Sequence, residues 1–317
     1  MHHVIALLAA LLLLAGGRAA LAADEAVSGA AANALPPIDA ATSLLVVAPH
    51  PDDETLCCAG VIQRVLHAGG RVTVLWITSG DAAIWDRVLI ERSLRPAAAL
   101  DLGARRMREA RAATARLGVA TDGQLFLGYP DGGLAELLEA PRARSHPSHS
   151  TRAVAVPYAD AVFAGHPYTG ESLVRDFGAV LERVRPNLIL APSPEDCHAD
   201  HRAAGLLAIE ASARQGPGPQ LRFWIVHGGE GWPSPRGLLP GVPLTAPPRS
   251  RGLFPAPFAL TPAEEDGKQR ALEAYDTQMR MMAPFLLAFV RTNELFSTSA
   301  APRAAGRTVA AGRRPGG

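Results

Sequence analysis

The segment at 50–54, His-Pro-Asp-Asp-Glu, constrains the fold and the chemistry of this chain more than any other part of it. It directly follows an apolar run at 43–48 that is typical of a buried β-strand, and a helical pattern begins at Thr55. In an open α/β sheet, ligands bind in the crevice beyond the carboxyl ends of the strands. So many ionisable groups beside a core are costly unless a cation or a proton-transfer role compensates them. A polar turn that caps a helix is the simpler alternative, but capping uses one oxygen and leaves the other groups unexplained.

Strand-like and helix-like patterns alternate along most of the chain. This alternation predicts a mostly parallel sheet that is covered by helices on both faces. No internal repeat is visible, and a single α/β domain over residues 43–296 fits the pattern better than two domains. The predicted strands are 43–48, 71–77, 124–127, 187–191 and 221–226, and the predicted helices are 55–68, 104–117, 172–184, 202–214 and the helical signals within 262–291.

The composition argues against a disordered chain and against a nucleic-acid-binding one. Hydrophobic residues at 48% and charged residues at 19% describe a globular protein with a sizeable core. The formal net charge is only +1, and no basic stripe interleaved with aromatic residues is present. We therefore expect no nucleic-acid partner.

The first 22 residues have the pattern of a signal peptide. Residues 4–15 are apolar, and Ala20-Leu21-Ala22 supplies a small-x-small cleavage site, although no Lys or Arg precedes the apolar run. The run is too short to span a bilayer comfortably, so we expect export to the periplasm or the extracellular space, with a retained anchor as the alternative. No later apolar run is long enough for a membrane helix. Residues 23–42 are predicted to be a linker, and residues 297–317 a disordered tail.

Three cysteines do not make a disulfide framework. Cys57 and Cys58 are adjacent at the start of a predicted helix and would be strained if they were bridged to each other, and Cys197 lies beside His198. We therefore expect buried, inert thiols.

A second polar turn follows the predicted strand at 187–191 and precedes the helix at 202–214. It carries His198, Asp200 and His201. If both strands lie near the centre of the sheet, the two turns face one crevice. Two imidazoles and one carboxylate with an open position for water are the ligand set of a catalytic zinc site. Imidazole-rich ligation favours zinc, or another divalent transition metal, over calcium or magnesium.

These residues resemble the motifs of the LmbE/PIG-L deacetylases. The segment 50–54 with Thr55-Leu56 resembles the first motif of that family, and 198–202, His-Ala-Asp-His-Arg, resembles the second motif, usually His-Pro-Asp-His. The resemblance extends over about 43–296 and implies a Rossmann-like fold. Supporting matches are Arg106-x-x-Glu109, Leu117-Gly118, the segment 127–132, and a closing helix with Lys268, Ala271, Leu272, Tyr275, Gln278 and 293–296.

The resemblance also implies a role for each site residue. His50, Asp53 and His201 would bind zinc, Asp52 would be the general base, and His198 the acid or the oxyanion partner. Arg106 and Asp131 would bind substrate, with Asp200 and Glu54 in supporting roles. The sequence departs from the family pattern at Cys57, Asp196 and Ala199, which changes no ligand but affects the expected pocket shape and oxyanion stabilisation.

Three of these roles have alternatives. Arg106 has helical spacing to Glu109 and would then form a surface ion pair. Asp131 lies in Pro-Asp-Gly-Gly, a composition typical of any tight turn. Asp200 would either orient His198 or contact the substrate.

The expected function is a zinc-dependent hydrolase that removes acetyl groups from an N-acetylated sugar or glycoconjugate by means of an activated water. The alternative is a metal-containing carbohydrate-binding protein without turnover. A metal-dependent phosphoesterase is disfavoured because the sequence lacks a second carboxylate-rich cluster. We expect the loops at 141–170 and 228–258 to shape the pocket, and the sequence identifies neither the sugar nor an oligomeric state.

Overall fold

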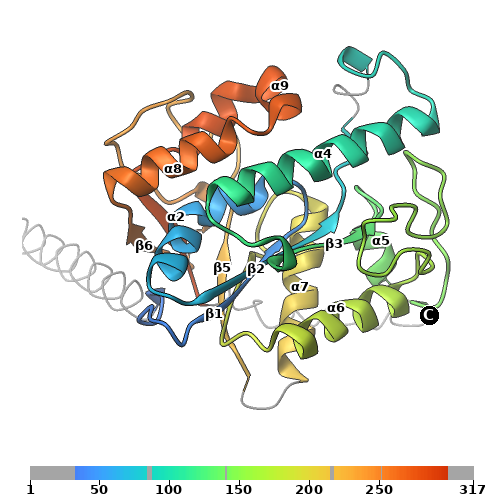
Figure 1. Cartoon of the computed structure of the whole chain (residues 1–317), viewed down its shortest axis with the longest axis horizontal. Helices are drawn as coiled ribbons and strands as arrows, with labels where there is room; N and C mark the ends of the chain where they lie inside the picture. The colour runs from blue at the N-terminus through green and yellow to red at the C-terminus, as the bar shows by residue number, and fades with distance from the viewer. Residues whose placement is uncertain (1–32, 84–87, 140, 215–217, 251, 299–317) are drawn as a thin grey trace, which may run out of the picture.

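A five-stranded sheet forms the centre of the computed structural model, which describes residues 33–83, 88–139, 141–214, 218–250 and 252–298. All strands of this sheet are parallel, and their order is β3-β2-β1-β4-β5. The predicted α/β domain with a mostly parallel sheet is therefore confirmed (Figure 1). The strands are β1 (Ser43–Ala48), β2 (Arg71–Thr78), β3 (Gln124–Tyr129), β4 (Leu188–Pro192) and β5 (Gln220–Trp224).

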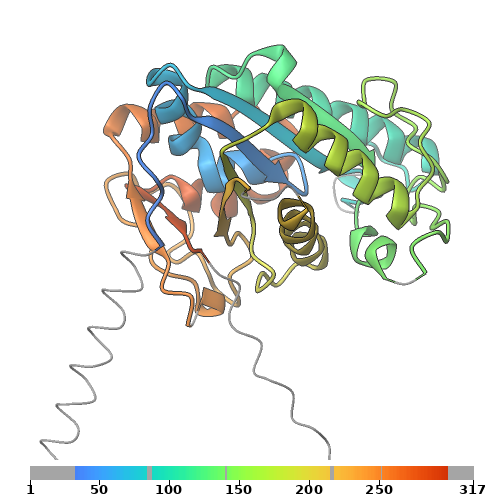
Figure 2. The ribbon, with the colours of Figure 1, turned by 90° about the horizontal axis from the view of Figure 1, so that it is seen from below.

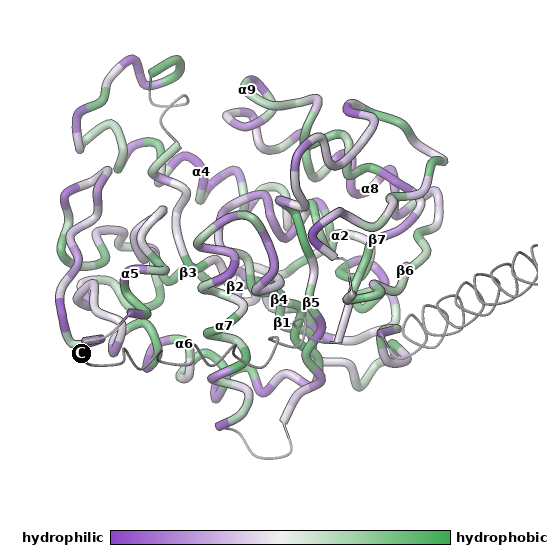
Figure 3. The backbone as a smooth tube through the Cα atoms, turned by 180° about the vertical axis from the view of Figure 1, so that it is seen from behind, coloured by the Kyte–Doolittle hydropathy of each residue, from purple (hydrophilic) through white to green (hydrophobic). Residues whose placement is uncertain are grey.

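The central strand β1 is buried along its whole length because other elements cover both of its edges and both of its faces. Its Leu44 pairs with Val72 of β2 on one side and with Leu188 of β4 on the other. A strand in this position has no solvent-facing side, which explains the continuous apolar run in the sequence. The hydropathy colouring shows the same concentration of apolar residues along the central strands (Figure 3).

Helices cover both faces of the sheet, as expected from the alternating pattern (Figures 1 and 2). On one face, α2 contacts β1 and β2, and α4 contacts β3; on the other, α6 contacts β3 and α7 contacts β1, β4 and β5. A short helix, α5, that the sequence did not predict contacts α6 and α7. The bounds are α2 (Asp53–His67), α4 (Pro96–Arg116), α5 (Leu134–Leu138), α6 (Gly170–Val184) and α7 (Ala199–Ala213).

Helix α4 begins eight residues earlier than the sequence predicted, at Pro96 instead of residue 104. Proline is well suited to the first turn of a helix because its fixed φ is helical and its missing N–H would have no intrahelical partner there. Arg95 before it is extended, which is the conformation that a following proline favours.

The strand order places a topological switch point between β1 and β4. From β1 the chain continues through α2 to β2 on one side, whereas β4 continues through α7 to β5 on the other. The turns that follow β1 and β4 therefore separate to opposite faces and leave a crevice between them, the usual ligand site of such sheets.

The C-terminal part of the chain forms two helices and a strand, and not the single closing helix that the sequence predicted. Two helices, α8 (Pro262–Leu272) and α9 (Asp276–Leu286), lead through a 3-10 turn at Leu287–Phe289 to a strand, β7 (Asn293–Phe296). The strand pairs antiparallel with β6 (Ala256–Ala259), so 293–296 does not belong to a helix. The Asn293 side chain also connects β7 to the segment before β6, because it accepts the backbone N–H of Leu244 and donates to the carbonyl of the same residue. Further 3-10 turns lie at Thr121–Gly123 and Pro248–Ser250.

A buried ion pair attaches this C-terminal part to α2. The Nζ of Lys268 in α8 lies 2.9 Å from Oε1 of Glu294 in β7, and both side chains are buried. The Glu294 carboxylate also accepts backbone N–H bonds from Gly60 and Val61 in the middle of α2. The position of α2, whose first residue is Asp53, is therefore tied to residues more than 200 positions later in the chain.

The cysteines differ from the expectation of free, buried thiols. Cys57 and Cys58 are joined by a disulfide, which needs no long-range approach because the two residues are adjacent in α2. Cys197 is free but exposed, and its Sγ accepts a hydrogen bond from Nε of Arg249 at 3.1 Å.

Both ends of the described chain contact the domain. Within the predicted linker, Leu35 and Ile38 pack against the core, and Asn33 donates to the carbonyl of Leu253. Beyond β7, Thr298 donates its backbone N–H to the Asn33 side chain. The predicted signal peptide and residues 299–317 lie outside the described residues. In the part that the structure describes, no helix has both the length and the apolar character to cross a bilayer.

Candidate metal centre

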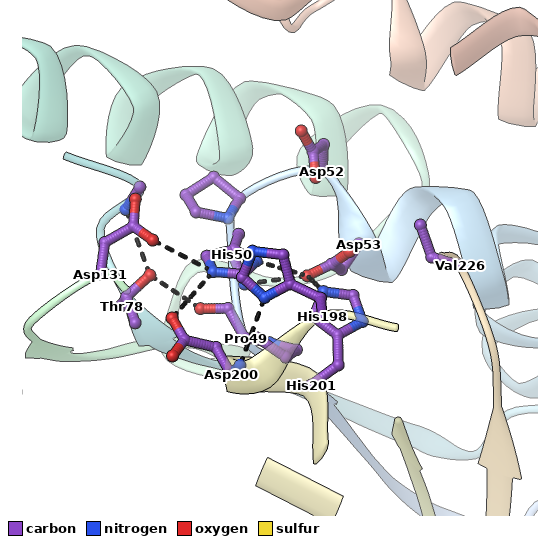
Figure 4. Close-up of polar contacts among 12 residues, drawn as sticks. Pro49, His50, Asp52, Asp53, Thr78, Asp131, His198, Asp200, His201 and Val226 are labelled. Carbon is purple, nitrogen blue, oxygen red and sulfur yellow. Dashed lines mark hydrogen bonds and ion pairs between the residues drawn. The ribbon is translucent and has the colours of Figure 1, made fainter. Parts of the chain in front are cut away.

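The turns after β1 and β4 meet at the switch point, as the sequence predicted (Figure 4). One carboxylate oxygen, Oδ2 of Asp53, lies 3.3 Å from Nδ1 of His50 and 3.2 Å from Nε2 of His201. The three predicted metal ligands therefore converge on one point, although His50 and His201 are 151 positions apart in the sequence. Asp53 is fixed from the other side because its Oδ2 also accepts the backbone N–H of His50.

The environment of His201 fits a cation. Its side chain is completely buried, yet neither ring nitrogen makes a hydrogen bond to any described residue. Nδ1 lies 3.3 Å from Oδ2 of Asp196, opposite the approach of Asp53. A buried imidazole without hydrogen bonds is unfavourable, and a metal ion at Nε2 would satisfy it. The donor set of two imidazoles and a carboxylate is the one that zinc prefers in catalytic sites.

The pKa values indicate how the chain compensates its charges without a cation. Burial lowers the pKa of His201, but Asp53 and Asp196 outweigh it and raise the pKa to about 9. Burial also lowers the pKa of His50, and the carboxylates of Asp131, Asp200 and Asp53 together raise it well above its usual value. Without a metal ion, protons on the rings of His50 and His201 therefore balance the charge of the nearby carboxylates. A divalent cation would balance the same charge, and its binding would release these protons.

Asp52 lies between the first two ligands in a rare backbone conformation. Its φ is 115°, a value that costs free energy for any residue other than glycine and that is common at functional sites. The carboxylate lines the pocket, and its Oδ2 lies 3.1 Å from a guanidinium nitrogen of Arg106. Burial raises the pKa of Asp52 to about 8 against the opposing charge of Arg106.

Arg106 lies at the pocket wall, where the sequence placed it, but with partners that the sequence did not predict. In addition to Asp52, its guanidinium donates to the carbonyls of Gly80 and Pro51 at 2.9 and 2.7 Å. The alternative pairing with Glu109 is not formed, because Glu109 accepts hydrogen bonds from Thr277. Arg106 therefore orients the carboxylate of Asp52, and contact with the substrate stays a prediction.

Asp131 and Asp200 both hold His50. Nε2 of His50 lies 3.2 Å from Oδ1 of Asp131 and 3.2 Å from Oδ2 of Asp200. Asp200 is fixed by the backbone N–H groups of Gly132 and Leu134, and Asp131 by that of Ala82. The side chain of Asp200 contacts the ring of His50, a partner that neither role considered for Asp200 included.

His198 caps helix α7 with its ring. Its Nδ1 accepts the backbone N–H of Asp200 at 3.2 Å, so that in the neutral ring the proton is on Nε2. Burial, together with the positive charges of His50 and His201, lowers the pKa of His198 to about 4. The ring lines the pocket as a neutral imidazole with one N–H to donate.

Glu54 is completely buried below the other acidic residues of the first motif. Its carboxylate accepts hydrogen bonds from Nε1 of Trp76, the hydroxyl of Tyr275 and the backbone N–H of Asp52. Glu54 therefore supports the turn from beneath and links it to the C-terminal part of the chain.

The pocket above these residues has a volume of about 270 Å³. Its second wall was missed by the sequence analysis, and it comes from the end of β5 and from α9. Helix α9 is kinked at Met282, two residues before Pro284, which turns this apolar wall toward the ligands. The wall residues are Val226, His227, Gln278, Met282, Phe285 and Leu286.

His227 could have been found from the sequence, because it follows the predicted strand 221–226 as the first two turns follow theirs. The residues of α9 carry no comparable signal. The expectation that the loops 141–170 and 228–258 shape the pocket is wrong for the described residues, since neither loop lines it. The first loop instead packs on β3, where Tyr168 donates to the carbonyl of Gly128 and the backbone N–H of Val162 to that of Phe126.

Three of the similar solved structures align with about three quarters or more of this chain. N,N'-diacetylchitobiose deacetylase from Pyrococcus horikoshii is 20% identical, with a TM-score of 0.52 over 81% of this chain and 83% of that one. A conserved protein from Thermus thermophilus is 24% identical, with a TM-score of 0.48 over 81% and 94% of the two chains. A40926 pseudoaglycone deacetylase is 19% identical, with a TM-score of 0.49 over 76% and 84%. A search of curated proteins finds no match.

The family comparison covers more than half of the chain. The model of the PIG-L family, described as GlcNAc-PI de-N-acetylase, matches residues 45–212. This segment contains both turns of the metal centre, from His50 to His201. The chain belongs to the PIG-L family.

Proposed function

We propose that this protein is a metal-dependent hydrolase that removes the acetyl group from an N-acetylated sugar or glycoconjugate. The observation that carries the proposal is the convergence of His50, Asp53 and His201 on one point, with Asp52 beside it in the same pocket. Membership of the PIG-L family supports the same reaction class. The deacetylation of diacetylchitobiose by a structural relative is consistent with an N-acetylated sugar as substrate.

His50, Asp53 and His201 would hold the metal ion, and their donor types favour zinc. When bound, the ion supplies Lewis-acid polarisation of the acyl carbonyl and lowers the pKa of water. Asp131, Asp200 and Asp196 would keep the two imidazoles oriented for this purpose.

Asp52 is the proposed general base. Its carboxylate lines the same pocket as the candidate ligands, and the ion pair with Arg106 keeps it oriented there. Asp52 takes a proton from the attacking water while the water oxygen bonds to the acyl carbon.

His198 is the proposed partner of the acyl oxygen. Because its Nδ1 accepts from the backbone of Asp200, the Nε2–H is available to donate to the oxygen as negative charge develops there. This role needs only a neutral ring, whereas the role of an acid, which the resemblance also allows, would need a protonated one.

The C–N bond breaks when the nitrogen receives a proton. Asp52, which then carries the proton of the attacking water and lines the pocket, is the group proposed to return it. The products are acetate and a free amine. Arg106 and Asp131, both at the pocket wall, are the proposed contacts for the sugar hydroxyl groups.

The experiment that tests this function is a metal analysis combined with an acetate-release screen over N-acetylated sugars and cell-envelope polymers. We expect zinc near one ion per chain and acetate release that a chelator abolishes and added zinc restores. Binding of sugars by the zinc-loaded protein without release of acetate from any of them would instead favour the carbohydrate-binding alternative.

We also propose that the protein is exported. The apolar run at 4–15 and the cleavage site at Ala20-Leu21-Ala22 support this location. N-terminal sequencing of the protein from the producing cells should give Ala23 as the first residue. A chain that still begins at Met1 in the membrane fraction would indicate the retained anchor.

A further inference from the structure

His227 lies in the metal centre although it belongs to neither motif. It follows strand β5, the edge strand next to β4, and its half-buried ring lines the same pocket as His50 and Asp53. Its ring centroid lies 4.7 Å from that of His201 and 5.2 Å from that of His198. The carboxyl ends of three neighbouring strands, not two, therefore contribute to the centre.

The backbone of His227 is fixed to the second motif at two points. Its N–H donates to Oδ2 of Asp196 at 3.0 Å, and its carbonyl accepts the N–H of Cys197 at 3.0 Å. Asp196 is the same residue that lies against Nδ1 of His201. One carboxylate thus sets the relative position of the two histidines.

The ring of His227 is held in place without using its nitrogens. One face stacks on Phe285 of α9, with centroids 6.0 Å apart and an interplanar angle of 14°. Among the described residues, neither ring nitrogen has a hydrogen-bond partner. A donor atom of His227 lies within 4.8 Å of donor atoms of both Asp53 and His201.

We propose that His227 is an additional protein ligand of the metal ion, which it holds together with Asp53 and His201 when no substrate is bound. The imidazole has an unused lone pair, its backbone is fixed by Asp196, and two members of the candidate ligand set lie within reach. The inference rests on the metal site of the proposed function and adds to it a ligand from the third strand end.

A fourth protein ligand changes what the substrate-free site can do. Sites with four protein ligands are closed to water, whereas catalytic sites keep one position open. A substrate would then have to displace His227, whose ring stacks on Phe285 of the apolar wall. His227 would protect the bound ion between turnovers and would open the site only when the pocket is filled.

The test measures metal affinity and coordination, and needs no substrate. The variants are His227→Ala and His227→Gln, the second of which keeps most of the side-chain volume against Phe285. The control is His149→Ala, an exposed histidine whose Nε2 contacts Glu136 outside the pocket. The zinc dissociation constant is obtained by competition with a chromophoric chelator, and the ligand number from the visible spectrum of the cobalt(II) protein.

We expect zinc affinity at least roughly 10–100-fold weaker in both His227 variants, the loss typical of disturbed ligand support, and unchanged affinity in the control. The cobalt(II) spectrum of both variants should change because water replaces an imidazole. Wild-type affinity together with an unchanged cobalt(II) spectrum in His227→Gln overturns the inference, even if acetate release is lost. Weaker metal binding in a protein that releases acetate from no sugar would retain the inference and refute the proposed function.

Discussion

The two strand-end turns and the C-terminal segment from 226 to 296 line the same pocket, but they contribute different types of residue. The turns at 50–54 and 196–201 bring buried charged groups that are held by one another and by backbone N–H groups. The C-terminal segment brings an apolar wall from the kinked helix α9, in which Met282 is 39% exposed. Sheet topology brings the two turns of the first region together, whereas only long-range contacts place the second.

The two regions therefore differ in their expected roles: the turns carry the proposed chemistry, and the C-terminal segment supports them. Residues that move protons or hold a cation need a rigid position, and the carboxyl ends of buried parallel strands supply it. The C-terminal segment stabilises that position from behind, through Glu294 on α2 and Tyr275 on Glu54. Changes in the turns should therefore abolish metal binding or catalysis, and changes in the C-terminal segment, except at His227, should act first on stability.

The largest expected effect is the loss of the metal ion in His201→Ala. This change removes a completely buried ligand, so zinc content should fall to background and acetate release should fall with it. Elemental analysis of the purified protein measures the first, and a coupled acetate assay the second. His166→Ala, which removes a histidine paired with Asp176 away from the pocket, is the control and should keep its zinc. If the His201→Ala protein still bound zinc and released acetate, the turn after β4 would not supply a metal ligand.

Lys268→Met should damage the C-terminal support and leave the ligand set intact. It leaves the buried carboxylate of Glu294 without its counterion, which typically costs about 3–5 kcal/mol of unfolding free energy. Denaturant unfolding followed by circular dichroism measures the loss. Arg280→Met breaks an exposed ion pair with Asp276 and should cost no more than about 0.5 kcal/mol. Equal stability of the two variants would mean that the C-terminal segment does not hold α2.

Asp196→Asn lies at the boundary between the two regions because Asp196 contacts His201 and also the backbone of Val226 and His227. The amide cannot compensate a charged metal–imidazole unit, so zinc affinity should fall roughly 10–100-fold. Chelator competition measures the change. Asp176→Asn, a buried aspartate that binds Tyr129 and His166, is the matched control and should leave zinc affinity unchanged. A similar loss in both variants would point to a general effect on folding.

The sequence predicted the parts of the molecule that depend on local patterns. The apolar run of β1, the alternation of strands and helices, and the polar turns after β1 and β4 together led to the correct sheet and to the meeting of His50 with His201. The strand pair β6–β7 was missed because its strands are four residues long and Pro257 lies in one of them. Periodicity carries little information over so short a length.

Within the site, the sequence predicted the three candidate ligands but not their contacts with other side chains. The contact of Arg106 with Asp52 and that of Tyr275 with Glu54 join positions 54 and 221 residues apart, which no local pattern encodes. His227 was missed for a different reason. It is a single histidine in a Gly-rich segment, and only its place after a strand distinguishes it from a loop residue.

Asp52→Asn provides the most direct test of the central claim that a metal centre and an adjacent base hydrolyse an acetamide. The substitution keeps the size of the side chain and removes its ability to accept the proton of the attacking water. We expect a zinc content like that of the wild type and a kcat for acetate release lower by roughly 10²–10⁴-fold. A zinc-loaded Asp52→Asn protein with the wild-type kcat would contradict the account.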